Sequence, residues 1–197
     1  MAQPHPDDEL NPTVTEGYKV GQAKTVQELA NLDKEDESLQ RWKASLGIGA
    51  SGSGGGAKKV VLKTLFLTSP TRQQGDVVLD LTQKPDELAR LKKEPITIKE
   101  GVDYSVGISF TVEGEIVSGL RYIQVVKRAG ITVDRGEHML GSYGPQDQPY
   151  IKIFASEESP SGMLARSGSY NVRSRVIDDD GAVWLDVEWG FKLGKEW

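Results

Sequence analysis

Apolar and polar positions alternate strictly in two stretches of the chain, residues 103–112 and 183–193. In the first stretch small or polar residues separate the apolar ones, which are Tyr104, Val106, Ile108, Phe110 and Val112. A period of two is typical of a β-strand that buries one face and exposes the other. Both stretches therefore predict half-buried strands.

Similar runs recur along the second part of the chain, at residues 59–68, 76–82, 95–99, 120–127, 131–134, 150–154 and 170–177. Turn signals separate them: "EGE" (113–115), "RAG" (128–130), "YGP" (143–145) and "DDDG" (178–181). Eight or nine short strands over about 140 residues predict an all-β fold, an immunoglobulin-like antiparallel β-sandwich over residues 58–197. The stretch "KPDELARLKKE" (84–94) lacks this pattern, and we expect a short helix there.

The N-terminal part has a different character. Residues 1–24 are polar and rich in proline, which predicts disorder. Thr25 and Glu28 have the spacing of a capping box, and Asp33 is placed to cap a second helix. We therefore expect a flexible, partly helical arm, a helical hairpin over residues 25–47. Its second helix has one apolar face, formed by Leu39, Trp42 and Leu46. The Gly/Ser-rich residues 48–57 predict a linker.

Charge and composition narrow the class of protein. The net charge of −5 argues against non-specific binding to nucleic acid. The chain has no cysteine, and its N-terminus has neither the basic region nor the apolar run of a signal peptide. No apolar run reaches the roughly 18 residues of a membrane-spanning helix. We expect a soluble, cytoplasmic protein without stable membrane insertion.

Catalytic chemistry has little support in the sequence. The only histidines are His5 and His138, so Cys–His and Ser–His–Asp arrangements are poorly supported. Gly47, Gly49 and Gly52 match the spelling of a dinucleotide motif, but they follow a predicted helix and run into more glycine. We predict no catalytic residue, no metal site and no cofactor.

Two acidic clusters leave two interpretations open. The run from Asp178 to Asp180 is followed by Gly181 and lies between predicted strands, which favours an acidic hairpin turn over a calcium loop. Mutual repulsion of the carboxylates would also be relieved by a basic partner. The pair Glu157 and Glu158 has the same two interpretations.

The inner faces of the predicted sandwich also allow two interpretations. In one, apolar side chains close a dry core; in the other, the sheets splay at one end and admit an apolar ligand. A sandwich normally fills its gap of about 10 Å with side chains, so periodicity alone favours the dry core.

Several segments together resemble the Rho GDP-dissociation inhibitors: "LDKEDESLQRWK", "IKEGVDYSVGISF", "EIVSGLRYIQ", "MLGSYGP", "GMLARSGSY", "SRVIDDD" and "VEWGFKLGKEW". The resemblance runs in order from about Tyr18 to Trp197. It implies a non-enzymatic sandwich with a regulatory arm. Such a protein binds prenylated small GTPases of the Rho, Rac and Cdc42 type, in a 1:1 complex. It slows GDP release and extracts the GTPase from membranes by hiding the geranylgeranyl lipid, which makes a cavity between the sheets the expected arrangement.

The resemblance also assigns residues to these roles. The prenyl pocket would be lined by Leu67, Ile96, Phe110, Ile116, Leu120, Leu185 and Trp189. The GTPase would be contacted by Tyr18, Asp33, Asp36, Glu37, Ser38, Asp179 and Asp180. An acidic rim for the basic segment before the prenylated cysteine would consist of Asp134, Glu157 and Glu158. Val187 departs from a tryptophan common in the family, so we expect a pocket of different shape.

Two other functions remain open from the sequence. A general prenyl-lipid carrier would use a similar sandwich without controlling nucleotide exchange, and it would not need the segment from Thr25 to Leu46. An adhesion or scaffold sandwich would have a filled core.

Overall fold

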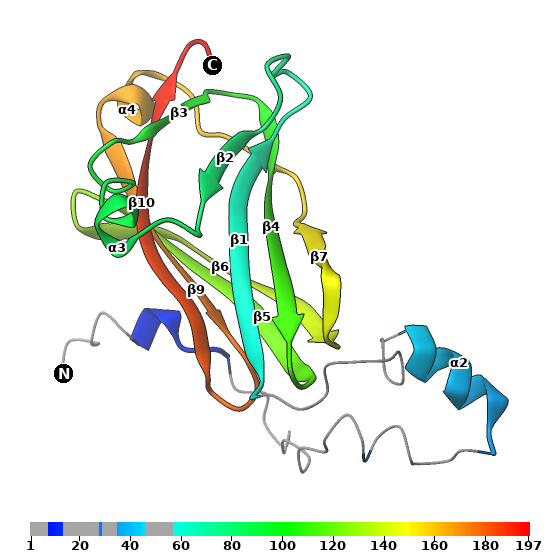
Figure 1. Ribbon diagram of the computed structural model, residues 1–197. Helices are drawn as coiled ribbons and strands as arrows, with labels where there is room; N and C mark the ends of the chain where they lie inside the picture. The colour runs from blue at the N-terminus through cyan, green and yellow to red at the C-terminus, as the bar shows by residue number, and fades with distance from the viewer. Residues whose placement is uncertain (1–7, 14–27, 29–34, 46–56) are drawn as a thin grey trace.

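The computed structural model describes residues 8–13, 28, 35–45 and 57–197, and its main body consists of two β-sheets packed face to face (Figure 1). The first sheet has the order β2 (Val77–Asp80), β1 (Lys59–Thr68), β4 (Asp103–Glu113) and β7 (Gln146–Ile153), and β8 (Glu157–Glu158) pairs with the start of β4. The second sheet has the order β3 (Ile96–Lys99), β10 (Val183–Gly194), β9 (Ser169–Ile177), β5 (Val117–Arg128) and β6 (Ile131–Tyr143). The predicted all-β sandwich is confirmed.

Four short helical segments complete the described structure: η1 (Asp8–Leu10), α2 (Glu37–Ser45), α3 (Pro85–Leu88) and α4 (Met163–Arg166). The expected helix over residues 84–94 is present only as α3, and hydrogen-bonded turns continue to residue 94. Pro85 begins α3 with the backbone angle that a first helical residue requires. Both α3 and α4 contact β10.

Two strand predictions need correction. The sheets are not wholly antiparallel, because β3 pairs in parallel with β10. These two strands are far apart in sequence, so no hairpin forces them to run in opposite directions. The predicted strand 131–134 extends to Tyr143 as β6. This edge strand is exposed along most of its length, so alternation of apolar residues could not mark its full extent.

The second helix of the arm begins later than predicted. The Oδ1 atom of Asp36 accepts hydrogen bonds from the backbone N–H groups of Ser38 (2.8 Å) and Leu39 (3.2 Å), so Asp36 caps α2 and the prediction of Asp33 is wrong. The first helix of the hairpin, apart from Glu28, and the linker 48–56 lie outside the described residues.

Within the segment 1–24 that we predict to be disordered, residues 8–13 include η1 and contact the second sheet. Leu10 is only 1% exposed and packs with Ile123, Val125 and Ile177. These three residues lie on the outer face of the second sheet. The sequence could not show this contact, because a single leucine in a polar segment has no periodicity.

The main core lies between the sheets as one contiguous cluster of buried side chains. It also contains a buried polar group. The Ser174 hydroxyl accepts a hydrogen bond from Trp189 Nε1 (3.0 Å) and shares another with Tyr122 Oη (2.8 Å), which in turn lies 3.1 Å from Gln124 Oε1. These contacts satisfy polar atoms whose burial would otherwise be costly.

Candidate functional site

The inner faces of the two sheets bring together most of the residues predicted for the pocket. Leu67, Phe110, Leu120 and Trp189 are buried in the main core, and Ile96 and Leu185 pack against it half-buried. Ile116 is half-buried in the turn between β4 and β5.

These residues occupy different heights in the sandwich. On β1 and β4, Leu67 pairs with Val106, whereas Phe110 pairs with Leu62. Four residues along β4 separate the two levels by about 13 Å. Two cavities border the outer side of the second sheet, one beside Glu9 and Leu10 and one between α3 and β10. Leu67, Phe110, Leu120 and Trp189 belong to one core cluster, and Ile96 and Leu185 pack against it.

One side of the sandwich is closed by aromatic side chains alone. β6 and β7 are the last strands of their respective sheets and share no backbone ladder. Rings bridge them at two levels, and we call these rings the aromatic seam: Phe110, Tyr122, His138, Tyr143, Tyr150 and Phe154. At one level the ring centroid of Phe154 lies 4.4 Å from His138 and 5.0 Å from Tyr122.

At the other level of the seam, Tyr143 of β6 and Tyr150 of β7 have their ring centroids 4.5 Å apart, and both contact Phe110. Phe110 was predicted for the pocket, but the other five seam residues were missed. Tyr143, Tyr150 and Phe154 belong to strand ends whose pairing the sequence does not reveal, and His138 lies beyond the predicted end of its strand.

The three predicted acidic-rim residues are exposed, and two of them act on the same tyrosine. The Tyr104 hydroxyl lies 3.4 Å from Glu157 Oε2. Burial raises the pKa of Tyr104, and the carboxylates of Glu157 and Asp134 raise this pKa further. Glu158 follows on β8 and pairs with Asp103. Negative charge from β6 and from β8 therefore gathers around Tyr104, at the start of β4.

The first carboxylate of the acidic turn is structural. Asp178 is buried and accepts hydrogen bonds from Lys58 Nζ (2.7 Å), Trp184 Nε1 (3.0 Å) and the backbone N–H groups of Asp180 and Ala182. Burial lowers the pKa of Lys58, but its bonds to Asp178 and Asp180 outweigh this and raise the pKa above its usual value. These contacts tie the turn between β9 and β10 to the start of β1.

The other two carboxylates of the turn differ in exposure. The side chain of Asp179 is 10% exposed and forms an ion pair with Arg121 (3.2 Å). It covers Gly119, where a Cβ atom would lie 1.9 Å from Asp179 Oδ2. The side chain of Asp180 is 47% exposed and contacts Lys58 Nζ at 2.6 Å. Of the two sandwich residues predicted to contact a GTPase, Asp180 is therefore the more exposed.

Three of the arm residues predicted to contact the GTPase lie at the N-terminus of α2. Asp36, Glu37 and Ser38 are consecutive and exposed, with Asp36 capping the helix and Glu37 paired to Arg41 at 3.3 Å. An acidic first turn is favourable next to the helix dipole. Tyr18 and Asp33 lie outside the described residues.

The described ranges lack two further types of site. They contain no group of three or more His, Cys, Asp or Glu side chains placed to hold a metal ion. They also contain no helix long and apolar enough to cross a membrane.

The described residues thus form a two-sheet sandwich with an apolar interior, with aromatic rings between β6 and β7 and acidic groups around Tyr104. Residues 3–196 match the family model described as "RHO protein GDP dissociation inhibitor". The chain belongs to this family, whose members are regulatory inhibitors and not enzymes. The resemblance drawn from the sequence segments is confirmed.

Individual relatives agree with this assignment. Rho GDP-dissociation inhibitor 1 of Bos taurus is 44% identical over 181 residues, which cover 91% of this chain and 86% of the relative. The Rho GDP-dissociation inhibitor of Schizosaccharomyces pombe is 39% identical over 180 residues, with 90% and 86% covered. That of Saccharomyces cerevisiae is 40% identical over 186 residues, with 91% of each chain covered.

Proposed function

We propose that this chain binds prenylated Rho-family GTPases in a 1:1 complex, slows their release of GDP, and removes them from membranes into the cytoplasm. In this proposal the geranylgeranyl group is held between the two sheets. The observation that carries it is the aromatic seam, where the sandwich is closed by side chains and not by a backbone ladder.

The seam offers a way into the core that breaks no backbone ladder. Moving two strands of a ladder apart breaks backbone hydrogen bonds, and each unmet buried group costs about 1–3 kcal/mol. Rotation of the Phe154 or Tyr150 ring breaks no strand pairing, because β6 and β7 belong to different sheets. We therefore propose that the lipid enters between these strands and displaces seam rings as it reaches Phe110 and Trp189.

The thermodynamic need for such a site is large. At about 0.8 kcal/mol per buried CH₂, exposing a lipid of about 20 carbons to water costs on the order of 10 kcal/mol or more. A soluble carrier must offer the lipid an environment of comparable apolarity. The continuous core cluster supplies it once side chains repack, and Leu67, Leu120 and Leu185 belong to or pack on that cluster.

The acidic residues beside the seam suit the basic segment that precedes a prenylated cysteine. Asp134, Glu157 and Glu158 are all exposed there. Complementary charge accelerates encounter and fixes orientation more than it adds affinity. We propose that these residues align the GTPase tail so that its lipid meets the seam.

The arm supplies the control of nucleotide exchange. We propose that Asp36, Glu37 and Ser38, together with Tyr18 and Asp33, contact the switch regions of the GTPase and favour their GDP-bound arrangement, which is a shift of population and not a chemical step. On the sandwich, we assign the GTPase contact to the exposed carboxylate of Asp180. Asp179 then acts by holding the turn through Arg121.

A membrane-extraction assay tests the proposal. The protein is mixed with vesicles that carry a geranylgeranylated Rho GTPase loaded with labelled GDP, and the vesicles are sedimented. We expect the GTPase in the supernatant and a slower loss of GDP. A GTPase that stays with the vesicles contradicts the proposal.

The same assay separates the proposal from the general lipid carrier. With an unrelated prenylated protein in place of the Rho GTPase, we expect no comparable extraction. Equal extraction of both proteins, with no effect on GDP release, would instead identify a carrier without GTPase specificity.

A further inference from the structure

The outer face of the second sheet is covered in part by the N-terminal residues of the same chain. Residues Asp8–Thr13, which we call the N-terminal strap, lie across this face (Figure 1). The strap is more than 100 residues away in sequence from the strands that it contacts. Its contacts are therefore tertiary and specific.

An apolar patch anchors the strap. Ile123 and Val125 of β5 and Ile177 of β9 are 0%, 2% and 7% exposed because Leu10 covers them. The outward face of a sheet is usually polar where it meets water. Three adjacent aliphatic residues on such a face are typical of a docking surface.

Basic side chains surround this patch and hydrogen-bond mainly to the backbone of the strap. Arg135 donates hydrogen bonds to the carbonyl oxygens of Glu9 (2.8 Å) and Asn11 (3.0 Å), and Arg121 donates to that of Thr13 (3.1 Å). Backbone contacts of this kind are available to any peptide that adopts the same conformation. They do not by themselves select the strap's own sequence.

A few side chains of the strap add specificity. The Glu9 carboxylate forms an ion pair with Lys127 Nζ (2.6 Å) and accepts a hydrogen bond from Thr132 Oγ1 (2.8 Å), and both contacts lower the pKa of Glu9. The Thr13 hydroxyl donates to Glu137 Oε2 (2.7 Å). With Leu10 in the apolar patch, the surface recognises the pattern Glu-Leu-x-x-Thr.

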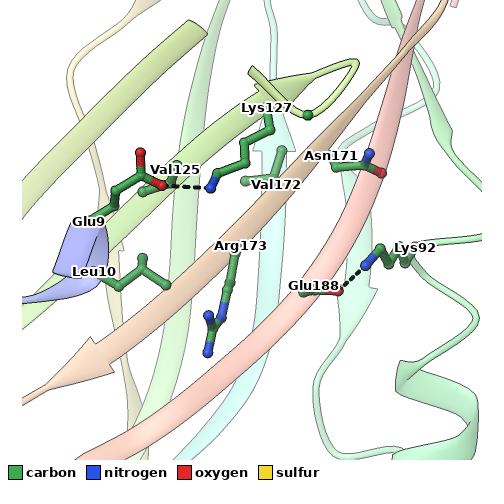
Figure 2. A pocket seen from close by; sticks show the side chains of 10 residues that line it. Glu9, Leu10, Lys92, Val125, Lys127, Asn171, Val172, Arg173 and Glu188 are labelled. Carbon is green, nitrogen blue, oxygen red and sulfur yellow. Dashed lines mark hydrogen bonds and ion pairs between the residues drawn. The ribbon is translucent and has the colours of Figure 1, made fainter. Parts of the chain in front are cut away.

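The groove continues beyond the strap. A cavity of about 180 Å³ extends from Glu9 and Leu10, past Lys127 and Arg173, to the ion pair of Lys92 and Glu188 beside β10 (Figure 2). The figure shows these side chains arranged around the cavity from opposite sides. A peptide longer than the strap therefore has room for further residues here.

We propose that this outer face is a docking surface for a partner protein that presents an acidic segment with the pattern Glu-Leu-x-x-Thr, and that the N-terminal strap occupies it in cis until the partner displaces it. A tethered segment has an effective concentration in the millimolar range, so it competes with a partner but does not exclude one. The surface lies on the outer face of β5, β6 and β9, whereas the aromatic seam rings project from the inner faces. At one end the surface adjoins the acidic turn, because Arg121 contacts both Thr13 of the strap and Asp179.

The test uses full-length chains and a fluorescent peptide that carries residues 5–16 of this sequence. Leu10→Asp removes the anchor of the strap and opens the surface. We expect the peptide to bind this variant saturably, with one peptide per chain, and to bind the unmodified chain at least tenfold more weakly. Equal affinity for the two chains would overturn the proposal.

Two further variants locate the site. Adding Arg135→Glu to the Leu10→Asp chain should weaken its affinity for the peptide at least tenfold. Adding Lys152→Glu instead, on β7 of the first sheet, should leave that affinity within twofold of the Leu10→Asp value. An unchanged affinity after Arg135→Glu would overturn the proposal. If near-ultraviolet circular dichroism shows that Leu10→Asp does not fold, Glu9→Ala replaces it in the same comparisons.

A second peptide decides between a partner and the strap alone. Its sequence is unrelated and acidic and retains only Glu-Leu-x-x-Thr. We expect it to bind the Leu10→Asp chain within about fivefold of the first peptide. Failure of this peptide to bind, or formation of a dimer of two chains through exchanged straps, would contradict a surface for a separate partner.

Discussion

Asp178 and Asp180 both contact the ammonium group of Lys58, yet their roles differ because their burial differs. The Asp178 carboxylate is fully buried and also holds Trp184 and two backbone N–H groups, whereas the side chain of Asp180 is about half exposed. Breaking a buried pair by removing one partner costs far more than breaking an exposed pair.

These two residues give a matched test of stability. We expect Asp178→Ala to lower the free energy of unfolding by about 3–5 kcal/mol. We expect Asp180→Ala to lower it by less than about 1 kcal/mol, because water solvates the groups that remain. Urea denaturation of both variants measures the difference, and equal midpoints would contradict the role given to Asp178.

Asp186 makes stability depend on pH. Burial raises its pKa, but hydrogen bonds from Arg173 (2.7 Å) and Arg175 (2.7 Å) outweigh burial and hold the pKa below its usual value. A carboxylate whose pKa is lowered by folding contributes stability above its unfolded pKa of about 3.9 and loses this contribution as the pH falls.

We therefore expect Asp186→Asn to destabilise the protein at pH 7 and to differ progressively less from the parent chain below about pH 4. Thermal unfolding across this range measures the effect. The exposed Asp76, replaced by Asn, is the control. A difference between Asp186→Asn and the parent chain that is constant with pH would exclude the ion pairs as its origin.

At the scale of the element, Asp36 is both the N-cap of α2 and a source of negative charge. Asp36 caps the helix through its Oδ1 atom and adds negative charge to an exposed first turn. Loss of the cap costs about 0.5–2 kcal/mol, and loss of a charge-assisted contact to a partner costs about 1.5–3 kcal/mol.

Serine separates these two roles, because it caps a helix and carries no charge. If the GTPase contacts the carboxylate, Asp36→Ser and Asp36→Ala should both weaken binding of a prenylated Rho GTPase by about tenfold or more, which is 1.4 kcal/mol. Titration with the labelled GTPase measures this. Near-parental affinity of Asp36→Ser would show that the cap matters and the charge does not.

The elements differ in how far sequence could predict them. Alternating apolar residues revealed β4 and β10, since each buries one face. The same logic failed for β6, whose exposed residues do not alternate, and for the strap, whose single apolar anchor depends on strands far along the chain. Local pattern predicts an element only where the element's own periodicity determines its burial.

At the scale of the whole molecule, every described strand follows Lys58, and this residue ties the acidic turn to β1. Most predicted pocket residues fell in the core because an inward position is set by strand period. Which strands face each other at an open edge of the sandwich is set by the order of strands in the two sheets, and period does not give that order. The aromatic seam was missed for this reason.

Removal of residues 1–57 tests whether the arm controls GDP release while the sandwich binds the lipid. We expect the remaining chain to unfold cooperatively and to bind a geranylgeranylated peptide, but not to slow GDP release. Full-length Leu10→Asp is the control, because it loses the strap contact and keeps the arm. Inhibition that persists after truncation would contradict the role of the arm.

The central claim is that the lipid reaches the core between β6 and β7. The chain contains no cysteine, so His138→Cys with Phe154→Cys places one thiol pair where two rings now stack at 4.4 Å. A short bifunctional thiol reagent then links the two strands. A second pair, Lys59→Cys with Glu113→Cys, links β1 to β4, which are already joined by a ladder.

The decisive measurement is the affinity for a geranylgeranylated peptide before and after crosslinking. We predict that the link across the aromatic seam weakens binding by about tenfold or more, and that the link between β1 and β4 changes it by less than about twofold. Equal affinity of the seam variant before and after crosslinking would contradict entry of the lipid between β6 and β7.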